Sequence, residues 1–463
     1  MPTTDRGPAG RRLAVRVTDD ALRQVRGGHP WIFERSITSA SHDAAPGTLA
    51  VVFDGRRRFA AIGLWDPTSP LRIRILHAGE PRSVDEGFWL ERLDAAVARR
   101  APLLADGSTT GLRVLNGESD GFPGLVLDLY DDTAVAKLYT AAWWPHLDGL
   151  VPLLLAASGA DRLVLRLARS VAADGARADG TVLVGDPLAG PVPFLERGLS
   201  FAADVVHGQK TGHFLDQRDN RALVGGLAAG AHVLDVFACT GGFSAHAAAG
   251  GARSVRSVDV SEPALGTARA NLERNRHLPA VAACEHVTEA GDAFEVLERH
   301  AAAGRTWDLV VIDPPSFAPR QEAVDRALRA YARLTRLGLA VTRPGGVLVQ
   351  SSCSSRIDAD TFHRQLHDVA ADEGRSLQVI ARTGHPVDHP ATFPEARYLK
   401  TAFVRVDPLA TVSDAGDGQR PFAERCIQSS TESHWPPQPH PAPRNPATSA
   451  AVSIPGRWFA RST

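Results

Sequence analysis

Residues 233–244 read VLDVFACTGGFS, and this stretch decides the fold. An apolar, β-rich run carries one acidic residue, Asp235, and passes through Gly241 and Gly242 into the Ala-rich segment 245–249. That order is typical of a buried parallel strand, a tight glycine turn and a helix. Glycines are needed at such a turn because the backbone can approach a ligand closely only where no Cβ stands in the way.

A second apolar run, residues 255–260, follows one βα unit later and carries Asp259 near its end. A carboxylate at the tip of the second strand is where a ribose diol is held by two hydrogen bonds. The two runs therefore predict an adenosine-type cofactor in a doubly wound α/β domain. The loop lacks the G-x-G-x-x-G spacing that seats a pyrophosphate. Asp235 suits the cationic amino group of S-adenosylmethionine and is poorly placed against an anionic pyrophosphate, so the residues favour S-adenosylmethionine over a dinucleotide. The alternative is a structural turn that binds no ligand.

The composition is that of an ordinary globular protein, with 44% hydrophobic and 22% charged residues in a chain of 463, long enough for two or three domains. Four cysteines lack C-x-x-C spacing, so we expect neither a metal site nor a disulfide framework. No apolar run approaches about 18 residues, so we expect a cytoplasmic protein without a membrane partner. Net charge is only −1, but residues 1–80 hold 12 Arg against 8 Asp and Glu, which suggests a phosphate-facing patch.

The first part of the chain, residues 11–82, alternates short β-like runs with turns and predicts a small barrel. Its predicted strands are 13–17, 49–53, 59–64 and 71–75. Trp31 and Phe33 are expected in the barrel core. The triplet Arg56 to Arg58 is either a solvated turn or a phosphate contact, which would position RNA without reading its sequence.

Three further parts follow along the chain. Residues 83–190 begin with a predicted helix and continue as a central α+β subdomain that carries no catalytic signal. Residues 191–406 hold the glycine loop and form the main α/β domain, whose last strand near 397–406 is expected to be an antiparallel edge. Residues 407–463 are rich in Pro, Ser and Thr and predict a disordered tail.

Two more strand ends in the main domain carry candidate catalytic groups. The apolar run 307–312 delivers Asp313 and two rigid prolines to the carboxyl edge of the sheet, where open α/β sheets bind ligands. Another apolar run begins at Val347, and Cys353 follows it among hydroxyl groups at the tip of the predicted strand, although a free cysteine is most often a buried small hydrophobic residue. Asp292 also follows a predicted strand, where it either accepts a hydrogen bond from an adenine amino group or lies in a surface loop.

A cysteine and an aspartate at neighbouring strand ends, Cys353 and Asp313, suggest nucleophilic attack on a pyrimidine base. The C5 carbon of a pyrimidine is inert, but a thiolate that adds to C6 makes C5 nucleophilic. Cys353 is the candidate nucleophile, and Asp313 could bond N3 and the exocyclic amine. Since the thiolate is the reactive form, we expect the pKa of Cys353 to be lowered. No residue stands out as the base that later removes the C5 proton.

Residues 11–406 resemble the RlmI-type large-subunit ribosomal RNA cytosine-C5 methyltransferases. The resemblance rests on six segments, which are Gly28–Phe33, Asn116–Gly124, Gln209–Arg218, Asp235–Gly242, Asp313–Pro315 and Ser352–Ser354. It implies a class I, Rossmann-like methyltransferase domain preceded by a PUA-like RNA-binding domain and a central α+β subdomain. Many enzymes of this chemistry carry a second cysteine where Ser316 stands here. His213 occupies a position where a second aromatic residue is expected.

The resemblance also implies a cofactor, a reaction and partners. S-adenosylmethionine would be contacted by residues of the glycine loop, of the strand ends and of the segment 209–218, namely Asp235, Phe237, Thr240, Gly241, Gly242, Asp259, Asp292 and Phe214. The segment 209–218 would form a lid over the cofactor, although it also suits the capped start of a helix. The product would be 5-methylcytosine in large-subunit ribosomal RNA, formed through a covalent intermediate with Cys353. Ribosomal RNA is the expected partner, and a homodimer is one option.

Three other functions stay open. A methyltransferase acting on a guanine nitrogen would use Asp313 and ignore Cys353. An NAD-type oxidoreductase is disfavoured by the glycine spacing. A non-catalytic RNA-binding protein with a relic cofactor pocket belongs to a different class, and it would bind RNA without transferring a methyl group.

Overall fold

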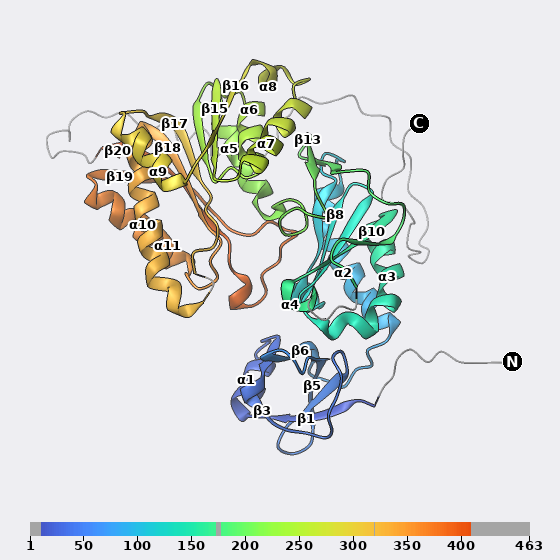
Figure 1. Ribbon diagram of the computed structural model, residues 1–463. Coiled ribbons are helices and arrows are strands. Elements are labelled where there is room, and N and C mark those ends of the chain that lie inside the picture. Colours follow the sequence, from blue (N-terminus) through green and yellow to red (C-terminus); the bar gives the residue numbers. More distant parts are fainter. Residues whose placement is uncertain (1–10, 173–176, 319, 409–463) are drawn as a thin grey trace, which may run out of the picture.

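The computed structural model describes residues 11–172, 177–318 and 320–408. From residue 409 onward, the tail predicted to be disordered lies outside these residues. The described chain forms three packed parts, with the N-terminal sheet at the bottom of Figure 1, the central sheet at the right and the largest sheet at the upper left. Within the described ranges, no helix is both long and apolar enough to cross a membrane.

The N-terminal part is a six-stranded mixed sheet, ordered β2-β6-β5-β4-β1-β3, around its own small core. Its elements are β1 (Leu13–Val17), α1 (Asp19–Arg26), β2 (Trp31–Phe33), β3 (Ile37–Ala40), β4 (Leu49–Phe53), β5 (Phe59–Trp65) and β6 (Leu71–Ala78). The four predicted strands are all present. The helix α1 was missed, although it has a local signal. That signal is Thr18, whose side chain accepts a hydrogen bond from the Ala21 N–H and so caps the start of the helix.

Trp31 and Phe33 do not lie in the core of this sheet, so that prediction was wrong. The Trp31 indole donates a hydrogen bond to Glu118 at 2.9 Å, and its ring packs edge-to-face on Phe393 with centroids 5.1 Å apart. Arg74 forms an ion pair with the same Glu118 at 2.9 Å, while Phe33 is 36% exposed. An indole with one polar end is well suited to a joint between parts, and these contacts tie the N-terminal sheet to the rest of the chain.

The central part is a five-stranded sheet, ordered β11-β10-β9-β8-β7. Its strands are β7 (Gly111–Asn116), β8 (Leu125–Tyr130), β9 (Thr133–Leu138), β10 (Arg162–Leu167) and β11 (Thr181–Val184). The helices α2 (Glu86–Leu104) and α3 (Trp144–Ser158) cover one face, and the short α4 (Arg169–Ala172) follows β10. The opposite face packs against the hairpin β12 (Val192–Glu196) and β13 (Leu199–Ala203) and against the third part.

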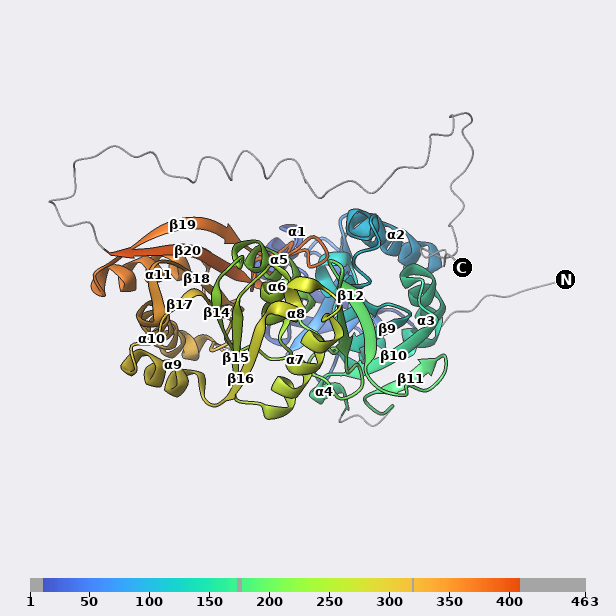
Figure 2. The same cartoon turned by 90° about the horizontal axis from the view of Figure 1, so that it is seen from above.

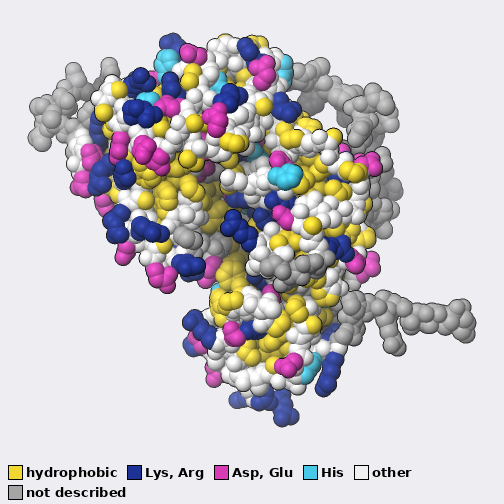
Figure 3. Space-filling view, in the orientation of Figure 1, with side chains coloured by type: hydrophobic (Ala, Val, Ile, Leu, Met, Phe, Trp, Pro, Cys, Tyr) yellow, Lys and Arg dark blue, Asp and Glu magenta, His cyan; other side chains and the backbone are white. Residues whose placement is uncertain are grey.

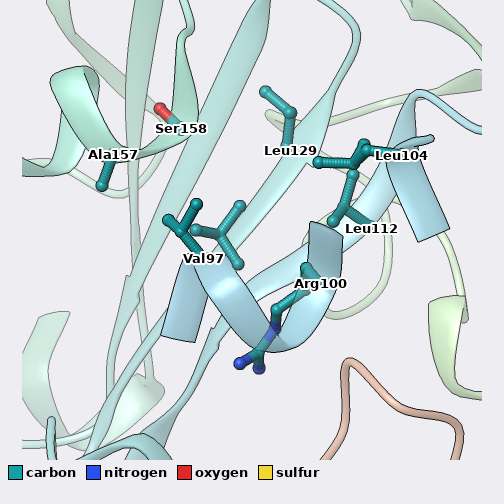
Figure 4. A pocket seen from close by; sticks show the side chains of 8 residues that line it. Val97, Arg100, Leu104, Leu112, Leu129, Ala157 and Ser158 are labelled. Atoms are coloured by element: carbon teal, nitrogen blue, oxygen red, sulfur yellow. The ribbon is translucent and has the colours of Figure 1, made fainter. Parts of the chain in front are cut away.

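A small cavity lies between α2 and the central sheet (Figure 4). Its volume is about 20 Å³, and side chains such as Val97, Leu104 and Leu129 line it. That volume admits about one water molecule, and the mostly apolar lining offers few hydrogen bonds. Arg100 reaches past it to bind Asp120 and the Asp388 carbonyl. The cavity is therefore a packing defect and not a substrate site.

The third part is a seven-stranded sheet, ordered β16-β15-β14-β17-β18-β20-β19. Its strands are β14 (His232–Val236), β15 (Ser254–Asp259), β16 (Glu285–Ala290), β17 (Trp307–Ile312), β18 (Thr342–Ser352), β19 (Arg375–Thr383) and β20 (Lys400–Pro408). The first five run parallel to one another. β20 is antiparallel, as expected, but it is not the edge, because β19 pairs along its outer side.

Helices cover both faces of this sheet (Figure 2). One group comprises α5 (Arg218–Leu227), α6 (Gly242–Ala249), α7 (Glu262–Arg274) and α8 (Pro279–Ala283), and the other α9 (Ala293–Ala302), α10 (Val324–Val341) and α11 (Ala359–Asp372). Alternate residues of one strand enter different cores, since Val233 packs with the first group and Leu234 with the second. This explains why the central strands read as continuous apolar runs.

Hydrogen bonds from the central part to a buried ion pair fix the third part against it. The Asp388 carboxylate accepts two hydrogen bonds from Arg218, at 2.9 and 2.8 Å, and a third from the Arg113 backbone N–H at 3.0 Å. Arg100, on α2, donates to the Asp388 carbonyl at 2.8 Å. These groups come from three distant segments of the chain, so they hold the two parts in one geometry.

Candidate functional site

The candidate site lies at the carboxyl edge of the third sheet, where three neighbouring strands end. β14 pairs with β17 through Val236 and Ile312, and β17 pairs with β18 through Ile312 and Gln350. The residues that follow these strands, the glycine loop, Asp313 and Cys353, therefore meet at one edge. The Cys353 thiol lies 3.7 Å from the Pro314 carbonyl oxygen, as donor to acceptor. The two predicted catalytic residues are thus brought together.

The glycine loop after β14 has an unusual backbone. Phe237, Cys239 and Gly241 have φ values of 65°, 48° and 74°, in the left-handed region that non-glycine residues rarely adopt. Such strain is held only where surrounding contacts fix it, and it concentrates at functional sites. The side chain of Asn271 provides one such contact by donating to the Thr240 carbonyl at 2.9 Å. A Cβ on Gly241 would stand 2.7 Å from the Ala268 Cβ, so glycine is required here.

Two carboxylates predicted to contact the cofactor border this loop. Asp259 ends β15, and its oxygens accept the N–H groups of Cys239 and Ser261, both at 2.9 Å. Asp235 is fully buried, and its Oδ2 accepts the Ser244 hydroxyl at 2.6 Å. Its Oδ1 has no hydrogen-bond partner among the described residues, and burial raises the pKa of Asp235 to about 6. An unpaired, buried carboxylate oxygen fits a cationic amino group.

The third predicted carboxylate, Asp292, is exposed and caps a helix. Its Oδ1 accepts the backbone N–H groups of Phe294 and Glu295 at 2.9 and 3.2 Å, at the start of α9. The cap accounts for one oxygen and leaves Oδ2 without a hydrogen-bond partner within the described ranges. Asp292 therefore has a structural role, and one oxygen remains available to a ligand.

Asp313 lies half-buried at the end of β17 and accepts a hydrogen bond from the Gln217 side chain at 2.8 Å. Burial raises the pKa of Asp313 to about 7, and the nearby Asp216 carboxylate adds to the increase, while Lys210 and Gln217 oppose it. A carboxyl group with a pKa near 7 can both donate and accept a proton at neutral pH. The sequence pointed to Asp313 but not to Gln217, its partner.

The segment 209–218 brings an ion pair to the same place. Lys210 donates to Asp216 at 3.0 Å, and its ammonium lies 4.2 Å from the centre of the Phe214 ring. Burial alone would raise the pKa of Asp216, but Lys210 and other partners hold it well below its usual range. Tyr398 donates to the same carboxylate at 2.8 Å. The segment leads directly into α5, so it is both a helix start and a wall of the site.

Cys353 is half-buried, and its pKa is raised to about 11, contrary to our expectation. Burial is the main cause, and the carboxylate of Asp313 adds to it. The cations of Lys210 and Lys400 oppose these effects without cancelling them. Lys400 is buried, and its ammonium donates to the carbonyls of Ser354 and Tyr398. Burial lowers the pKa of Lys400 to about 8.

His213, the unexpected residue in the segment 209–218, belongs to the core. Its ring is buried between Phe194 and Phe201, with centroids 5.1 and 5.4 Å away, and neither ring nitrogen forms a hydrogen bond within the described chain. Burial lowers the pKa of His213 to about 3, so the ring is neutral at physiological pH. An aromatic ring would fill the same space.

Four residues of the site were missed from the sequence, namely Asp216, Gln217, Tyr398 and Lys400. One signal for Lys400 was available, because the chain contains only three lysines and a buried lysine is rare. Tyr398 and Lys400 lie nearly 190 residues after Lys210 along the chain, and only the pairing of β20 with β18 places them beside Cys353.

A second candidate site is an open groove on the N-terminal sheet. It has a volume of about 400 Å³, and Arg16, Arg57, Ser39, Ser41 and Phe53 contribute to its lining. Neither arginine has an ion-pair partner among the described residues, whereas the neighbouring Arg58 pairs with Asp54 at 2.8 Å. Free guanidinium groups beside hydroxyl groups and an aromatic ring match the chemistry of a nucleotide strand.

Comparison with known proteins identifies the family. Residues 151–405 match the model of S-adenosylmethionine-dependent methyltransferases, and residues 15–78 match that of PUA-like domains. A ribosomal RNA large subunit methyltransferase from Deinococcus radiodurans is 47% identical over 86% of this chain and 98% of its own. The ribosomal RNA large subunit methyltransferase I of Alteromonas mediterranea is 34% identical over 82% and 95%.

A solved methyltransferase structure complexed with SAH has a TM-score of 0.72 at 23% identity, over 85% of this chain and 99% of that one, which shows the shared fold. The predicted architecture of a PUA-like domain and a methyltransferase domain is confirmed, and so is S-adenosylmethionine as the cofactor of the family. The chain belongs to the S-adenosylmethionine-dependent methyltransferases, in the family of the ribosomal RNA large subunit methyltransferases.

Proposed function

We propose that this protein methylates the C5 carbon of a cytosine in large-subunit ribosomal RNA through a covalent bond between Cys353 and C6 of the base. The observation that carries the proposal is the position of the Cys353 thiol, 3.7 Å from the carbonyl of Pro314 and therefore beside Asp313. A methyltransferase acting on a base nitrogen needs the Asp-Pro-Pro loop but has no use for a thiol at that point.

The residues at the carboxyl edge would hold the cofactor. We assign the amino group to Asp235, the ribose to Asp259 and the adenine to Asp292, with the backbone of the glycine loop closing over it. Phe237, Thr240, Gly241, Gly242 and Phe214 would complete this cradle. When bound, S-adenosylmethionine supplies an electrophilic methyl group. The proposal draws on the unpaired oxygen of Asp235 and on the left-handed backbone of the glycine loop.

Asp313 would orient the cytosine and accept the charge that develops on it. The N3 atom of cytosine is a hydrogen-bond acceptor, whereas the N3 of uracil carries a proton. A carboxyl group with a pKa of about 7 is protonated in part at neutral pH and can then donate to N3. Gln217 fixes the carboxyl group through one oxygen and leaves the other for the base.

The RNA would also bind away from the reacting base. Lys and Arg side chains gather in the hollow where the parts of the molecule meet, on the face seen in Figure 3. We assign a backbone contact to the groove of Arg16 and Arg57 on the PUA-like domain, because unpaired guanidinium groups bind phosphates without reading sequence. The relatives named above carry ribosomal RNA in their names, which supports the substrate class. A homodimer stays a prediction.

The test is a trapping experiment with large-subunit RNA that contains 5-fluorocytosine. Fluorine cannot leave as a proton does, so the covalent adduct should accumulate and map to Cys353 by peptide mass spectrometry. Cys353→Ala should abolish both the adduct and the methylation of ordinary RNA, and Cys284→Ser, between α8 and β16, should leave both intact. Methylation retained by Cys353→Ala would overturn the proposal in favour of a nitrogen acceptor on a guanine, and RNA binding without any methyl transfer would favour a non-catalytic protein.

A further inference from the structure

Because the pKa of Cys353 is raised, the thiol is protonated at neutral pH and is a poor nucleophile. The proposed function therefore needs a group that removes the thiol proton. Charged and titratable groups face this thiol from every element packed around it. They are Asp313 after β17, Lys210 and Asp216 in the segment 209–218, Tyr331 on α10, and Tyr398 and Lys400 at the start of β20. How these groups are paired decides which proton is free to move.

Both cations near the thiol are engaged by other oxygen atoms. Lys210 donates to the Asp216 carboxylate at 3.0 Å, and Lys400 donates to the carbonyls of Ser354 and Tyr398. The sulfur atom instead lies against a carbonyl oxygen, that of Pro314. A carbonyl oxygen can only accept a hydrogen bond, so this neighbour can pair with the thiol and offers nothing to a thiolate. The surroundings of the sulfur atom therefore suit the thiol better than the thiolate.

Asp313 offers an unpaired oxygen that a base entering the site can reach. Asp216 receives Lys210 and Tyr398 on its Oδ2, and its Oδ1, which has no hydrogen-bond partner among the described residues, is buried. Asp313 receives Gln217 on Oδ1, while its Oδ2 has no hydrogen-bond partner in the described parts of the chain and is not enclosed. Asp313 and Cys353 follow adjacent strands of the sheet, β17 and β18. A base that enters between them can contact both.

We propose that Asp313 keeps Cys353 in its thiol form until a cytosine occupies the site, and that Asp313 then carries the thiol proton to N3 of that base. The inference rests on the proposed function and goes beyond it, since it assigns to Asp313 the control of the nucleophile as well as the orientation of the base. Lys210 and Lys400 act as positioning residues, whose positive charge stabilises the thiolate once the carboxylate beside it has been neutralised.

Protons and electrons balance when Cys353 adds to C6 of the cytosine. The Asp313 carboxylate takes the proton as the S–H bond breaks, and the sulfur electron pair forms the bond to C6. The π electrons of C5=C6 become the C4=C5 double bond, and those of C4=N3 move to N3, which takes the proton from Asp313. One proton has moved from sulfur to N3, and Asp313 is again a carboxylate.

The same arrangement would protect the enzyme between turnovers. A thiolate beside an electrophilic methyl donor is liable to be alkylated itself, whereas the protonated thiol reacts far more slowly. With the thiolate formed only when cytosine accepts a proton from Asp313, the nucleophile would be generated only when its correct target is present. A uracil, which carries its own proton on N3, could not complete the transfer.

The test measures alkylation of Cys353 by iodoacetamide in protein free of RNA and cofactor, at pH 8, with each cysteine followed by peptide mass spectrometry. Asp313→Asn removes the negative charge and keeps an acceptor for Gln217. We expect Cys353 in this variant to react about three- to tenfold faster than in the wild type, even though methyl transfer is lost. A pKa lower by one raises the thiolate fraction about tenfold, and the lower intrinsic nucleophilicity cancels part of the gain.

Two comparisons make the result specific. Lys210→Met, at a side chain that is 39% exposed, should slow alkylation of Cys353, because it removes a charge of the opposite sign. Cys284 serves as an internal reference, since burial and Glu285, but not Asp313, raise its pKa. An unchanged or slower reaction of Cys353 in Asp313→Asn, with Cys284 unchanged, would overturn the inference. If wild-type protein still formed the fluorocytosine adduct, the proposed function would stand without it.

Discussion

At the scale of single residues, the protonation of Asp313 should set the pH dependence of the reaction. Above its pKa of about 7 the carboxylate can accept the thiol proton, and below it that acceptor is lost. We therefore expect kcat/KM for RNA to rise with pH through a midpoint near 7 and to fall again above about pH 8, where Lys400 loses the positive charge that stabilises the thiolate. Initial rates of methyl transfer between pH 5.5 and 9 measure this.

Gln217→Leu provides the control for that assignment. The hydrogen bond from Gln217 favours the Asp313 carboxylate, so its loss should raise the pKa of Asp313 and move the midpoint to higher pH. A midpoint that stays in place in this variant would show that another group titrates. Asp235, with a pKa of about 6, is the next candidate.

The sequence could predict that Asp313 and Cys353 meet at one edge of the sheet but not how they are protonated. Asp313 and Cys353 each follow an apolar strand, and strand order alone brings them to one edge. The pKa of Cys353 was expected to be lowered, and it is raised, because its value depends on burial and on an adjacent carboxylate. Neither quantity can be read from spacing along the chain.

At the scale of an element, the turn from β14 into α6 should tolerate no side chain at Gly241. Gly241→Ala would suffer the cost of a left-handed residue, about 1 kcal/mol, and a contact of 2.7 Å with Ala268 Cβ, worth about 1–3 kcal/mol more. We expect a lower free energy of unfolding in urea and a loss of SAH binding by calorimetry.

Gly251→Ala, just beyond the other end of α6, is the matched control. Its φ of +89° carries a similar backbone cost, but a Cβ there would meet only the Ala229 Cα at 3.8 Å. This variant should lose about 1 kcal/mol of stability and keep its affinity for SAH. Equal losses in the two variants would show that the conformation of the turn matters and the close approach to α7 does not.

Elements with strong apolar runs were predictable, whereas those defined by their neighbours were not. β14, β15 and β17 appear where the sequence places them. β20 was expected at the edge, but β19 covers it, and β19 has no fully buried residue and no regular alternation of apolar and polar residues, so its signal is weak. Trp31 resembles a core residue in composition, yet it joins two parts of the molecule through Glu118.

At the scale of the whole molecule, the order of the parts followed from composition, while the joints between them did not. The turn chemistry of residues 11–82 and the apolar strands of the methyltransferase part are local signals. The Arg100 guanidinium of the central part donates to the Asp388 carbonyl of the methyltransferase part, 288 positions further along the chain, and no local pattern predicts this bond. Such joints hold the central and methyltransferase parts in one geometry.

If the groove of Arg16 and Arg57 contacts the RNA backbone, the two arginines should contribute to the salt dependence of RNA affinity. Arg16→Ala/Arg57→Ala should weaken RNA binding and reduce the slope of log K against log salt by about 1.4, since each phosphate contact on single-stranded RNA contributes about 0.7. Arg23→Ala/Arg26→Ala removes the same charge from the same domain, but these arginines already pair with Asp20 and Asp54. That control should leave the slope nearly unchanged. Equal slopes for the two double variants, measured by fluorescence anisotropy from 50 to 300 mM salt, would mean that the groove makes no direct contact with the RNA backbone.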